Sequence, residues 1–244
     1  MALLDRNTLK TFFNQGKLPS QENFHDLIES SVNKLDDGLS KSMDEGLMLS
    51  PVGDTNKLVS FFKNIEDRSP IWSFTTGQGS RELHLQNLQG ESIMTFGQEG
   101  QVGVNCPQPQ HSLEVGATLG AKGRVGTLYK GSVEANGKWH PIIENLNGCH
   151  AFEIVAGVGK KKTGKYALVI AQAISTFGDA HDRIRTTQAY YGSRGNMIEF
   201  RWKGETYNYR LEMRTKGNYE GNTVANYHVM SLWEDQFMDE SFIE

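Results

Sequence analysis

Residues 83–126 constrain the fold of this 244-residue chain most, because they alternate very short apolar runs with glycine. The runs cover residues 83–85, 93–96, 102–104 and 113–115, and each is closed by Gly, Asn or Pro. No helical period runs through them, so we expect short strands. Hairpins of such strands are marginal in water, and their edges need partners. The stretch therefore predicts a narrow β stalk whose edges pair with copies of the same chain.

The composition is typical of a chain with much exposed surface, because only 37% of the residues are hydrophobic and the mean hydropathy is −0.51. The net charge of −4 favours neither nucleic acid nor an anionic membrane as a partner. Basic residues dominate residues 159–216, and acidic residues dominate residues 234–244. We interpret this asymmetry as a solvated surface; mutual shielding and two separate contact surfaces are the alternatives.

The sequence predicts neither export by a signal peptide nor membrane insertion. Residues 1–13 carry charges where a signal peptide needs an apolar core, and no apolar run is long enough to span a bilayer. Cys106 and Cys149 lie far apart without a CxxC neighbour, so no disulfide framework or zinc cluster is expected. We expect the chain to be synthesised and folded in a cytoplasm.

Residues 1–38 predict a helical attachment region, here called the foot, that consists of two short helices. Asn7 or Thr8 is expected to cap the first helix and Ser20 the second. Two such helices bury too little surface to fold alone, so their apolar stripe is either a simple hairpin core or a docking surface for a host particle or other copies. The predicted docking residues are Phe12, Phe13, Phe24, Leu27 and Ile28, and Val32 and Leu35 continue the stripe.

Residues 39–126 are the predicted stalk, and residues 127–244 are the predicted head. The head strands are longer and alternate in polarity, which predicts an antiparallel β-sandwich or jelly roll of roughly seven or eight strands. The basic stretch of residues 157–164 is expected to form a hairpin loop. Further strands are expected at residues 46–49, 58–62 and 71–74 of the stalk and at residues 152–155, 166–174, 184–191, 197–202, 207–214 and 227–233 of the head.

The chemistry-bearing patterns do not combine into an active site. Residues 159–165 match the start of a phosphate-binding loop, but Tyr166 replaces the required Ser or Thr and a strand follows. Asp179, His181 and Asp182 are interpreted as a polar turn. No histidine spacing fits a metal site, although ligands from separate strands stay an open alternative. We predict no catalytic residue, no metal and no cofactor; carboxylate pairs from different strands would leave no signature in the spacing.

An aromatic turn at residues 190–196 is the candidate binding site of the head. Tyr190 and Tyr191 are adjacent in a strand, so their rings point to opposite faces and one of them tends outward. Aromatic rings beside amide and guanidinium groups suit sugar or protein surfaces. The predicted receptor-binding residues are Tyr190, Tyr191, Arg194 and Asn196, and a purely structural role for them is the alternative.

Three parts of the sequence, in the foot, the stalk and the head, carry familiar motifs. The foot contains residues 8–13, the Gly-Lys-Leu-Pro-Ser-Gln of residues 16–21 and residues 24–30. It resembles the two helices that precede the shaft in tail-fibre-like and receptor-binding proteins of phages and phage-tail-like contractile injection particles. Residues 101–115 resemble the VGIGT-x-P-x-x-x-LxV shaft repeat of that family, although residues 105–107 depart from the usual Thr-rich link. Residues 137–142 and 188–192 are similar to the globular end that follows such shafts.

The resemblance implies a homotrimer with an intertwined stalk. It further implies a foot docked on baseplate or tail proteins and a head that recognises a cell-surface receptor, often a glycan. Such a protein is a structural component without enzymatic activity, assembled into a particle that is released from the cell. Three alternatives stay open: a purely structural baseplate or adaptor component, a stand-alone lectin, and a glycan-degrading tailspike.

Overall fold

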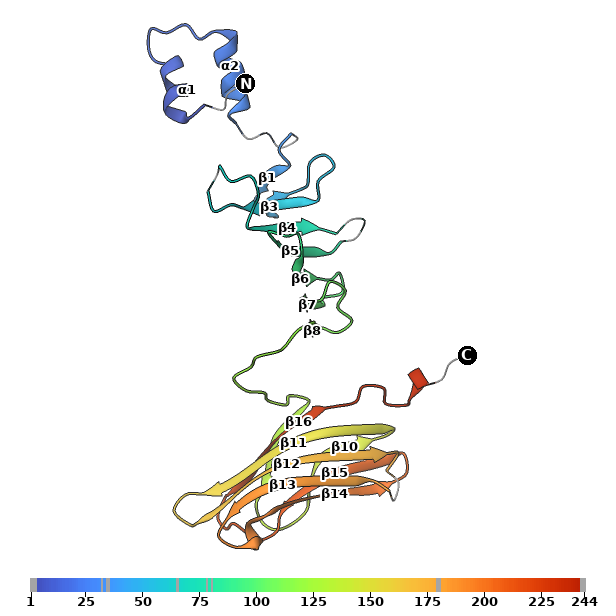
Figure 1. Cartoon of the computed structure of the whole chain (residues 1–244). Helices are drawn as coiled ribbons and strands as arrows, with labels where there is room; N and C mark the ends of the chain where they lie inside the picture. The colour runs from blue at the N-terminus through green and yellow to red at the C-terminus, as the bar shows by residue number, and fades with distance from the viewer. Residues whose placement is uncertain are drawn as a thin grey trace. The chain divides into compact units, whose positions relative to one another are not determined.

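The computed structural model describes residues 4–31, 33, 36–64, 66–77, 79, 81–178 and 181–241. The described chain is mainly β, with two short α-helices near its start, which confirms the predicted fold class at this level (Figure 1). The chain divides into two compact units, Met1–Gly120 and Ala121–Glu244. Among the described residues, no helix is both long and apolar enough to span a membrane.

The first helix, α1 (Arg6–Phe12), begins earlier than the predicted caps imply. Its cap is Asp5, whose carboxylate accepts hydrogen bonds from the backbone N–H groups of Asn7 at 2.8 Å and Thr8 at 3.2 Å. A carboxylate can accept from two of the N–H groups that a helix start leaves free. The prediction of Asn7 or Thr8 as the cap was therefore wrong.

The second helix, α2 (Gln21–Glu29), begins at the predicted cap. Ser20 accepts a hydrogen bond from the backbone of Asn23, and the Asn23 side chain accepts one from the Ser20 backbone, which completes a capping box. The helix ends at Glu29, so it contains the first half of the predicted apolar stripe. Val32 and Leu35, which were expected to continue that stripe, lie outside the described residues.

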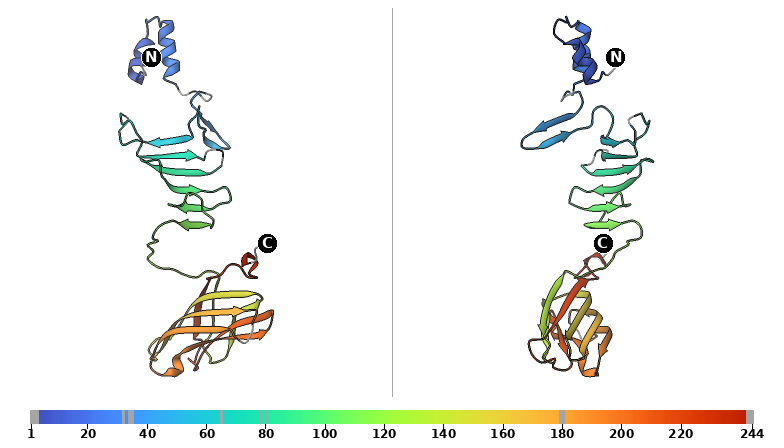
Figure 2. Two further views of the ribbon diagram at one scale, coloured as in Figure 1. Left: turned by 45° about the vertical axis from the view of Figure 1, so that its right-hand side comes forward. Right: turned by 90° about the vertical axis from the view of Figure 1, so that its left-hand side faces the viewer.

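A hairpin of β1 (Leu39–Ser42) and β2 (Gly46–Leu49) precedes a six-stranded sheet in which the strands follow chain order. The sheet consists of β3 (Lys57–Phe61), β4 (Trp72–Thr76), β5 (Leu83–Asn87), β6 (Ser92–Phe96), β7 (Val102–Val104) and β8 (Leu113–Val115). Figure 2 shows these strands as a single ladder. All neighbours are antiparallel except β7 and β8, which are parallel. The four short strands predicted between residues 83 and 115 are all present.

The register of the six-stranded sheet separates an apolar face from a polar face. Alternate residues of a strand point to opposite faces, and directly paired residues share a face. The central apolar row consists of Phe74, Leu85, Met94, Val104 and Val115. The central polar row consists of Thr75, His84, Thr95, Gly103 and Glu114. The two faces of this sheet are therefore chemically different.

Gly103 occupies a position that leaves no room for a side chain. The parallel pairing of β7 with β8 requires the chain to cross between them, and a Cβ atom at Gly103 would collide with the backbone carbonyl of Cys106. Asn105 starts the crossing with φ at 51°, in the left-handed region that Asn tolerates. The Val-Gly-Val pattern thus places valines on the apolar face and a glycine beneath the crossing segment.

Replacing Gly103 with Ala is expected to destabilise β6 to β8 by more than about 2 kcal/mol, because the collision is with backbone rather than with a movable side chain. Native-state hydrogen exchange on the full chain measures the opening free energy of β6 to β8 by itself. A local measurement is needed because the two units need not unfold together. Gly120→Ala is the matched control, since no atom lies within 4 Å of its added Cβ. Equal protection loss in both variants would contradict this explanation.

The second unit contains two antiparallel sheets, with strand orders β13-β12-β11-β16-β9 and β10-β15-β14 (Figure 1). The strands are β9 (Tyr129–Glu134), β10 (His140–Leu146), β11 (Cys149–Lys160), β12 (Lys165–Thr176), β13 (Arg183–Tyr191), β14 (Ile198–Glu205), β15 (Asn208–Thr215) and β16 (Val224–Ser231). Two 3-10 turns, η1 (Arg194–Asn196) and η2 (Asp239–Ser241), complete the unit. Both sheets contribute to one core, in which Ile154, Val169, Leu211 and Val229 are 0% exposed.

Tyr219 anchors the loop between β15 and β16. Its ring is 0% exposed, and its hydroxyl donates a hydrogen bond of 2.7 Å to the backbone carbonyl of Asn196. Burial raises the pKa of Tyr219 from 10.0 to about 12, because the charged phenolate would lose its hydration. The neutral hydroxyl is therefore the form that the folded state requires.

The stability of the second unit is expected to fall as the pH rises from 10 through about 12. The unfolded phenol loses its proton first, so the Tyr219 contribution is complete below pH 10 and disappears above the folded pKa. Tyr219→Phe should be less stable than the wild type below pH 10 but should lose less stability across this window. Denaturant unfolding of the full chain, followed by tryptophan fluorescence, compares the two. Parallel pH profiles would contradict the assignment.

Candidate functional site

The outer face of the five-stranded sheet carries several exposed apolar side chains, and Gln172 interrupts them between Ile170 and Ile174. Side chains alternate along β12 between buried and exposed, and the exposed ones include most of the large residues. The register places Ala189 and Tyr191 of β13 and Val155 of β11 on the same face. This set, here called the apolar face of the head, consists of Val155, Tyr166, Leu168, Ile170, Ile174, Ala189 and Tyr191.

The inner side of β12 is lined mainly by small residues. Ala167, Ala171 and Ala173 are at most 6% exposed and belong to the same core as the bulky residues of β15. In contrast, Leu168 and Ile174 on the outer side are 57% and 53% exposed. A strand that is apolar on both faces is typical of a sheet that is covered on both sides. The composition of β12 therefore indicates that its outer side is a surface suited to being covered by a partner, rather than a face adapted to water.

Glycines in β11 make room for the large side chains of β12. Gly159 pairs with Tyr166, and a Cβ atom at Gly159 would lie 2.6 Å from Cδ1 of that ring. Gly157 pairs with Leu168 in the same way, with 3.4 Å to the leucine methyl group. These glycines belong to the strand, so the hairpin loop predicted for residues 157–164 was too long; the turn covers residues 161–164.

The lysines of the phosphate-loop-like motif have structural partners. Lys160 Nζ donates hydrogen bonds to the carbonyls of Tyr219 and Glu220 at 3.3 and 3.2 Å. Lys165 Nζ donates to the carbonyl of Asn218 at 3.1 Å. The motif is a β-hairpin that holds the loop between β15 and β16, and it has no helix N-terminus that could receive a phosphate.

The predicted receptor-binding residues lie close together, but they differ in accessibility. Tyr191 is 68% exposed and Tyr190 is 38% exposed, at the end of β13. Arg194 is exposed in η1, directly after the glycine turn. Asn196 is only 7% exposed, and its side-chain amide donates a 2.6 Å hydrogen bond to the Tyr191 carbonyl. Asn196 therefore shapes the turn, whereas the two rings and the guanidinium are accessible.

The outer face of the three-stranded sheet is charged and internally paired. Glu212 is 3% exposed and accepts hydrogen bonds from Arg201 at 2.6 Å and Arg210 at 2.7 Å. Burial alone would raise the pKa of Glu212, but the bonds to these two guanidinium groups lower it below its usual value. The Trp139 ring lies 4.3 Å from the Arg201 guanidinium carbon and 4.4 Å from that of Arg214. This face is satisfied without a partner, unlike the apolar face of the head.

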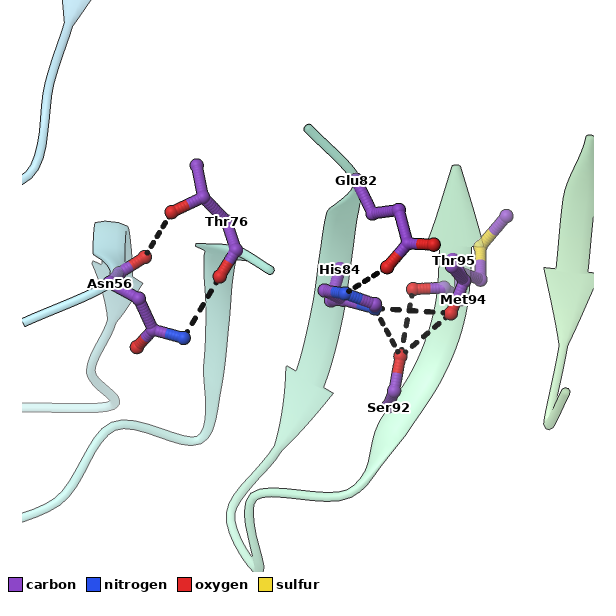
Figure 3. Close-up of polar contacts among 7 residues, drawn as sticks. All are labelled: Asn56, Thr76, Glu82, His84, Ser92, Met94 and Thr95. Carbon is purple, nitrogen blue, oxygen red and sulfur yellow. Dashed lines mark hydrogen bonds and ion pairs between the residues drawn. The ribbon is translucent and has the colours of Figure 1, made fainter. Parts of the chain in front are cut away.

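The polar face of the six-stranded sheet holds a histidine network that was not expected from the sequence (Figure 3). His84 Nδ1 lies 3.1 Å from Ser92 Oγ and 3.2 Å from Thr95 Oγ1, and its Nε2 lies 3.6 Å from a carboxylate oxygen of Glu82. Ser92 Oγ also lies 3.2 Å from the Met94 carbonyl. The alternation of polar residues in β4 to β6 was the available signal. The network links adjacent strands and satisfies partly buried polar groups.

The predicted docking residues of the foot are largely accessible. Phe24 and Ile28 are 48% and 66% exposed, Phe13 and Leu27 are 38% and 37% exposed, and Phe12 is half-buried. Phe13 and Phe24 form an edge-to-face contact with ring centroids 5.5 Å apart. Leu18, which was not predicted, is 98% exposed in the turn between the helices.

Of the predicted polar turn, His181 and Asp182 lie within the described residues. Asp182 accepts hydrogen bonds from the Ser175 hydroxyl at 2.9 Å and the Thr176 N–H at 3.1 Å, which fixes the start of β13. Asp179 lies outside the described residues. Within the described ranges, no group of three or more His, Cys, Asp or Glu side chains is placed to hold a metal ion. Cys106 and Cys149 are both free thiols.

The similarity of this chain to known proteins is weak. No protein family matches the chain, and no curated protein is detectably similar in sequence. Among solved structures, the tailspike protein of Acinetobacter phage vB_ApiP_P1 is similar with a TM-score of 0.27 and 10% sequence identity. The similar region covers 47% of this chain and 24% of that chain. A similarity this low carries no argument about fold or function.

Proposed function

We propose that this protein is a non-enzymatic structural component that assembles with copies of itself into a tail-fibre-like homotrimer of a phage or contractile injection particle. In this proposal the foot docks on baseplate or tail proteins, and the head binds a cell-surface receptor. The receptor class that we propose is a glycan. The chain itself needs no cofactor, nucleic acid or membrane for this role.

One observation carries the proposal: the apolar face of the six-stranded sheet has no cover. Among the described residues, no helix or second sheet makes extensive contact with this face. Met94, Leu85 and Val104 are only half-buried there. Full burial of an exposed side chain of this kind contributes about 1.5–3 kcal/mol, so covering the half that is still exposed would contribute roughly half of that per residue. Association of copies through this face would supply that burial, whereas an isolated sheet of one layer would not.

The number of three copies comes from the family resemblance of residues 101–115, since an uncovered face requires a partner without fixing the number of copies. The structure gives that motif a physical reason. Val102 and Val104 pair with Leu113 and Val115 and extend the apolar face of the six-stranded sheet, while Gly103 passes beneath the crossing chain. Each copy of such a shaft repeat would therefore add apolar side chains to the same face of the sheet.

The docking role of the foot is supported by how little its described residues bury. Leu9 is buried at 8% exposure, and the described side chains of α2 include none in the buried class. A pair of helices with so little burial does not fold stably on its own. An apolar groove on a particle protein would cover Phe24, Leu27 and Ile28, which share one side of α2 at helical spacing.

A second candidate function, a structural adaptor whose head contacts other proteins rather than a receptor, is favoured by the apolar face of the head. Glycan sites combine aromatic rings with several hydrogen-bonding groups. Tyr190, Tyr191 and Arg194 offer such a combination, but the apolar face offers mainly hydrocarbon, interrupted by Gln172. The two functions therefore differ in which part of the head makes the contact.

Light scattering on the full chain tests the assembly. The expected mass is three times 27.3 kDa, and Met94→Asp should lower it by placing a charge on the uncovered face. Leu88→Asp is the matched control, because Leu88 is a 55% exposed leucine in a turn of the same sheet and should leave the mass unchanged. A wild-type mass of 27.3 kDa at all concentrations would refute the proposal.

Binding of the fluorescently labelled full chain to host cells tests the receptor role. Arg194→Ala should weaken binding by about tenfold or more, because an exposed guanidinium at an interface is worth about 1.4 kcal/mol or more. Its fold should be intact, since the side chain is exposed in η1. Lys130→Ala, an exposed cation on β9, is the control. Unchanged cell binding by the Arg194 variant would favour the adaptor function.

A further inference from the structure

We propose that the apolar face of the head is a permanent contact surface between copies of this chain. The inference rests on the proposed self-assembly and goes beyond it, because the uncovered face of the six-stranded sheet belongs to the other unit. It assigns the outer side of β12, rather than the strand edges, as the surface at which the heads meet. The occupant of this surface is a second copy of the same head.

The size of the apolar face fits an interface. Its larger side chains range from 37% exposed at Val155 to 68% exposed at Tyr191. With roughly half of each side chain exposed, they present on the order of 500–700 Å² of apolar surface, at the upper end of the largest patch on a typical monomer, about 300–600 Å². A standard interface buries about 800 Å² on each partner, so this face with its rim reaches the required size.

The arrangement of polar groups around the apolar face matches the anatomy of an interface. The cross-strand rows through Leu168 and Ile170 are aliphatic at their centre. Arg183 and Arg185 border the face on β13, and Asn226 and His228 of β16 lie at its opposite border, next to Gly157 and Val155 of β11. An apolar centre within a polar rim is the usual arrangement between protein surfaces.

The choice of a second copy over a foreign protein follows from the rest of the chain. An apolar patch of this size promotes aggregation if it stays open, so a cover that is present from assembly onward is expected. Two separate units of this chain each leave one apolar sheet face uncovered. Association of identical chains supplies a cover for both at once, whereas foreign partners would have to match two unrelated surfaces. The charged outer face of the three-stranded sheet, with its internal ion pairs, needs no such cover.

Tyr191 then has a different role from the one expected from the sequence. Its ring lies opposite Tyr166 in the register and continues the apolar face, so it contacts the neighbouring copy. Tyr190 pairs with the buried Ala167 and belongs to the other side of β13. Arg194 follows in η1, beyond the end of the strand. The receptor contact of the head would then fall to Arg194 and Tyr190, at the border of the contact between copies.

Site-specific photocrosslinking in the purified full chain tests the inference. A benzophenone amino acid at Leu168 should yield covalent dimers and trimers of the chain, because Leu168 lies at the centre of the proposed contact. The same group at Lys203, an exposed residue on the outer side of the three-stranded sheet, should yield none. Adding Ile170→Lys to the Leu168 probe should reduce the crosslinked product at least about tenfold, since a buried unpaired charge is costly.

Three outcomes separate this inference from the proposed function. Crosslinks at Leu168 but not at Lys203, in a protein of trimeric mass, support both. A trimeric mass without crosslinks at Leu168 overturns the inference, leaves the assembly intact and points to a foreign partner for the apolar face. A monomeric mass overturns both proposals. Ile170 is 50% exposed, so the lysine variant should fold, and circular dichroism checks this directly.

Discussion

A sheet of one layer cannot cover its own apolar side, and this constraint governs both units of the chain. In the six-stranded sheet the register gathers Phe74, Leu85 and Met94 on one face, while the histidine network and the segment that crosses Gly103 occupy the other. In the head, the three-stranded sheet covers the inner side of β12. The outer side of β12 is left uncovered, because nothing in the described part of the head packs on it. Hydrophobic burial is the dominant favourable term in association as in folding, and for this reason we propose these two faces as the contact surfaces.

Glycine decides how closely the layers and strands can approach. Gly103 allows the backbone to cross directly over β7, and Gly159 allows the Tyr166 ring to lie across β11. In both places the glycine conformation is ordinary, and the missing Cβ is what matters. The same residue type therefore produces two different results: a parallel pair of very short strands in one unit, and a large outward-facing ring on a long strand in the other.

Much of the strand pattern could be predicted from the sequence, because short apolar runs closed by glycine mark β5 to β8, and strict alternation marks β14 and β15. The strands β1, β9 and β10 gave no such signal: β9 lies at a sheet edge with mostly polar residues, and β10 contains Pro141. The Asp5 cap lay just outside the expected helix start. The outward direction of the large β12 residues was not predictable either, since alternation of alanine with leucine or isoleucine does not say which set faces the core. That direction depends on the bulk that β15 brings from the opposite sheet.

The position of the accessible aromatic turn links assembly to recognition. Tyr190 is the second-to-last residue of β13, and Arg194 begins η1 shortly after the strand ends. Ala189 and Tyr191 of the same strand belong to the apolar face of the head. If copies meet through that face, each contact between heads would bring the proposed receptor-binding groups of different chains near one another. Weak single contacts then act together, because the second binding event occurs at the effective concentration set by the assembly. In our proposal, a head whose turn offers only the Tyr190 ring and the Arg194 guanidinium would bind a cell surface tightly without a deep pocket, provided that its own copies hold it in register.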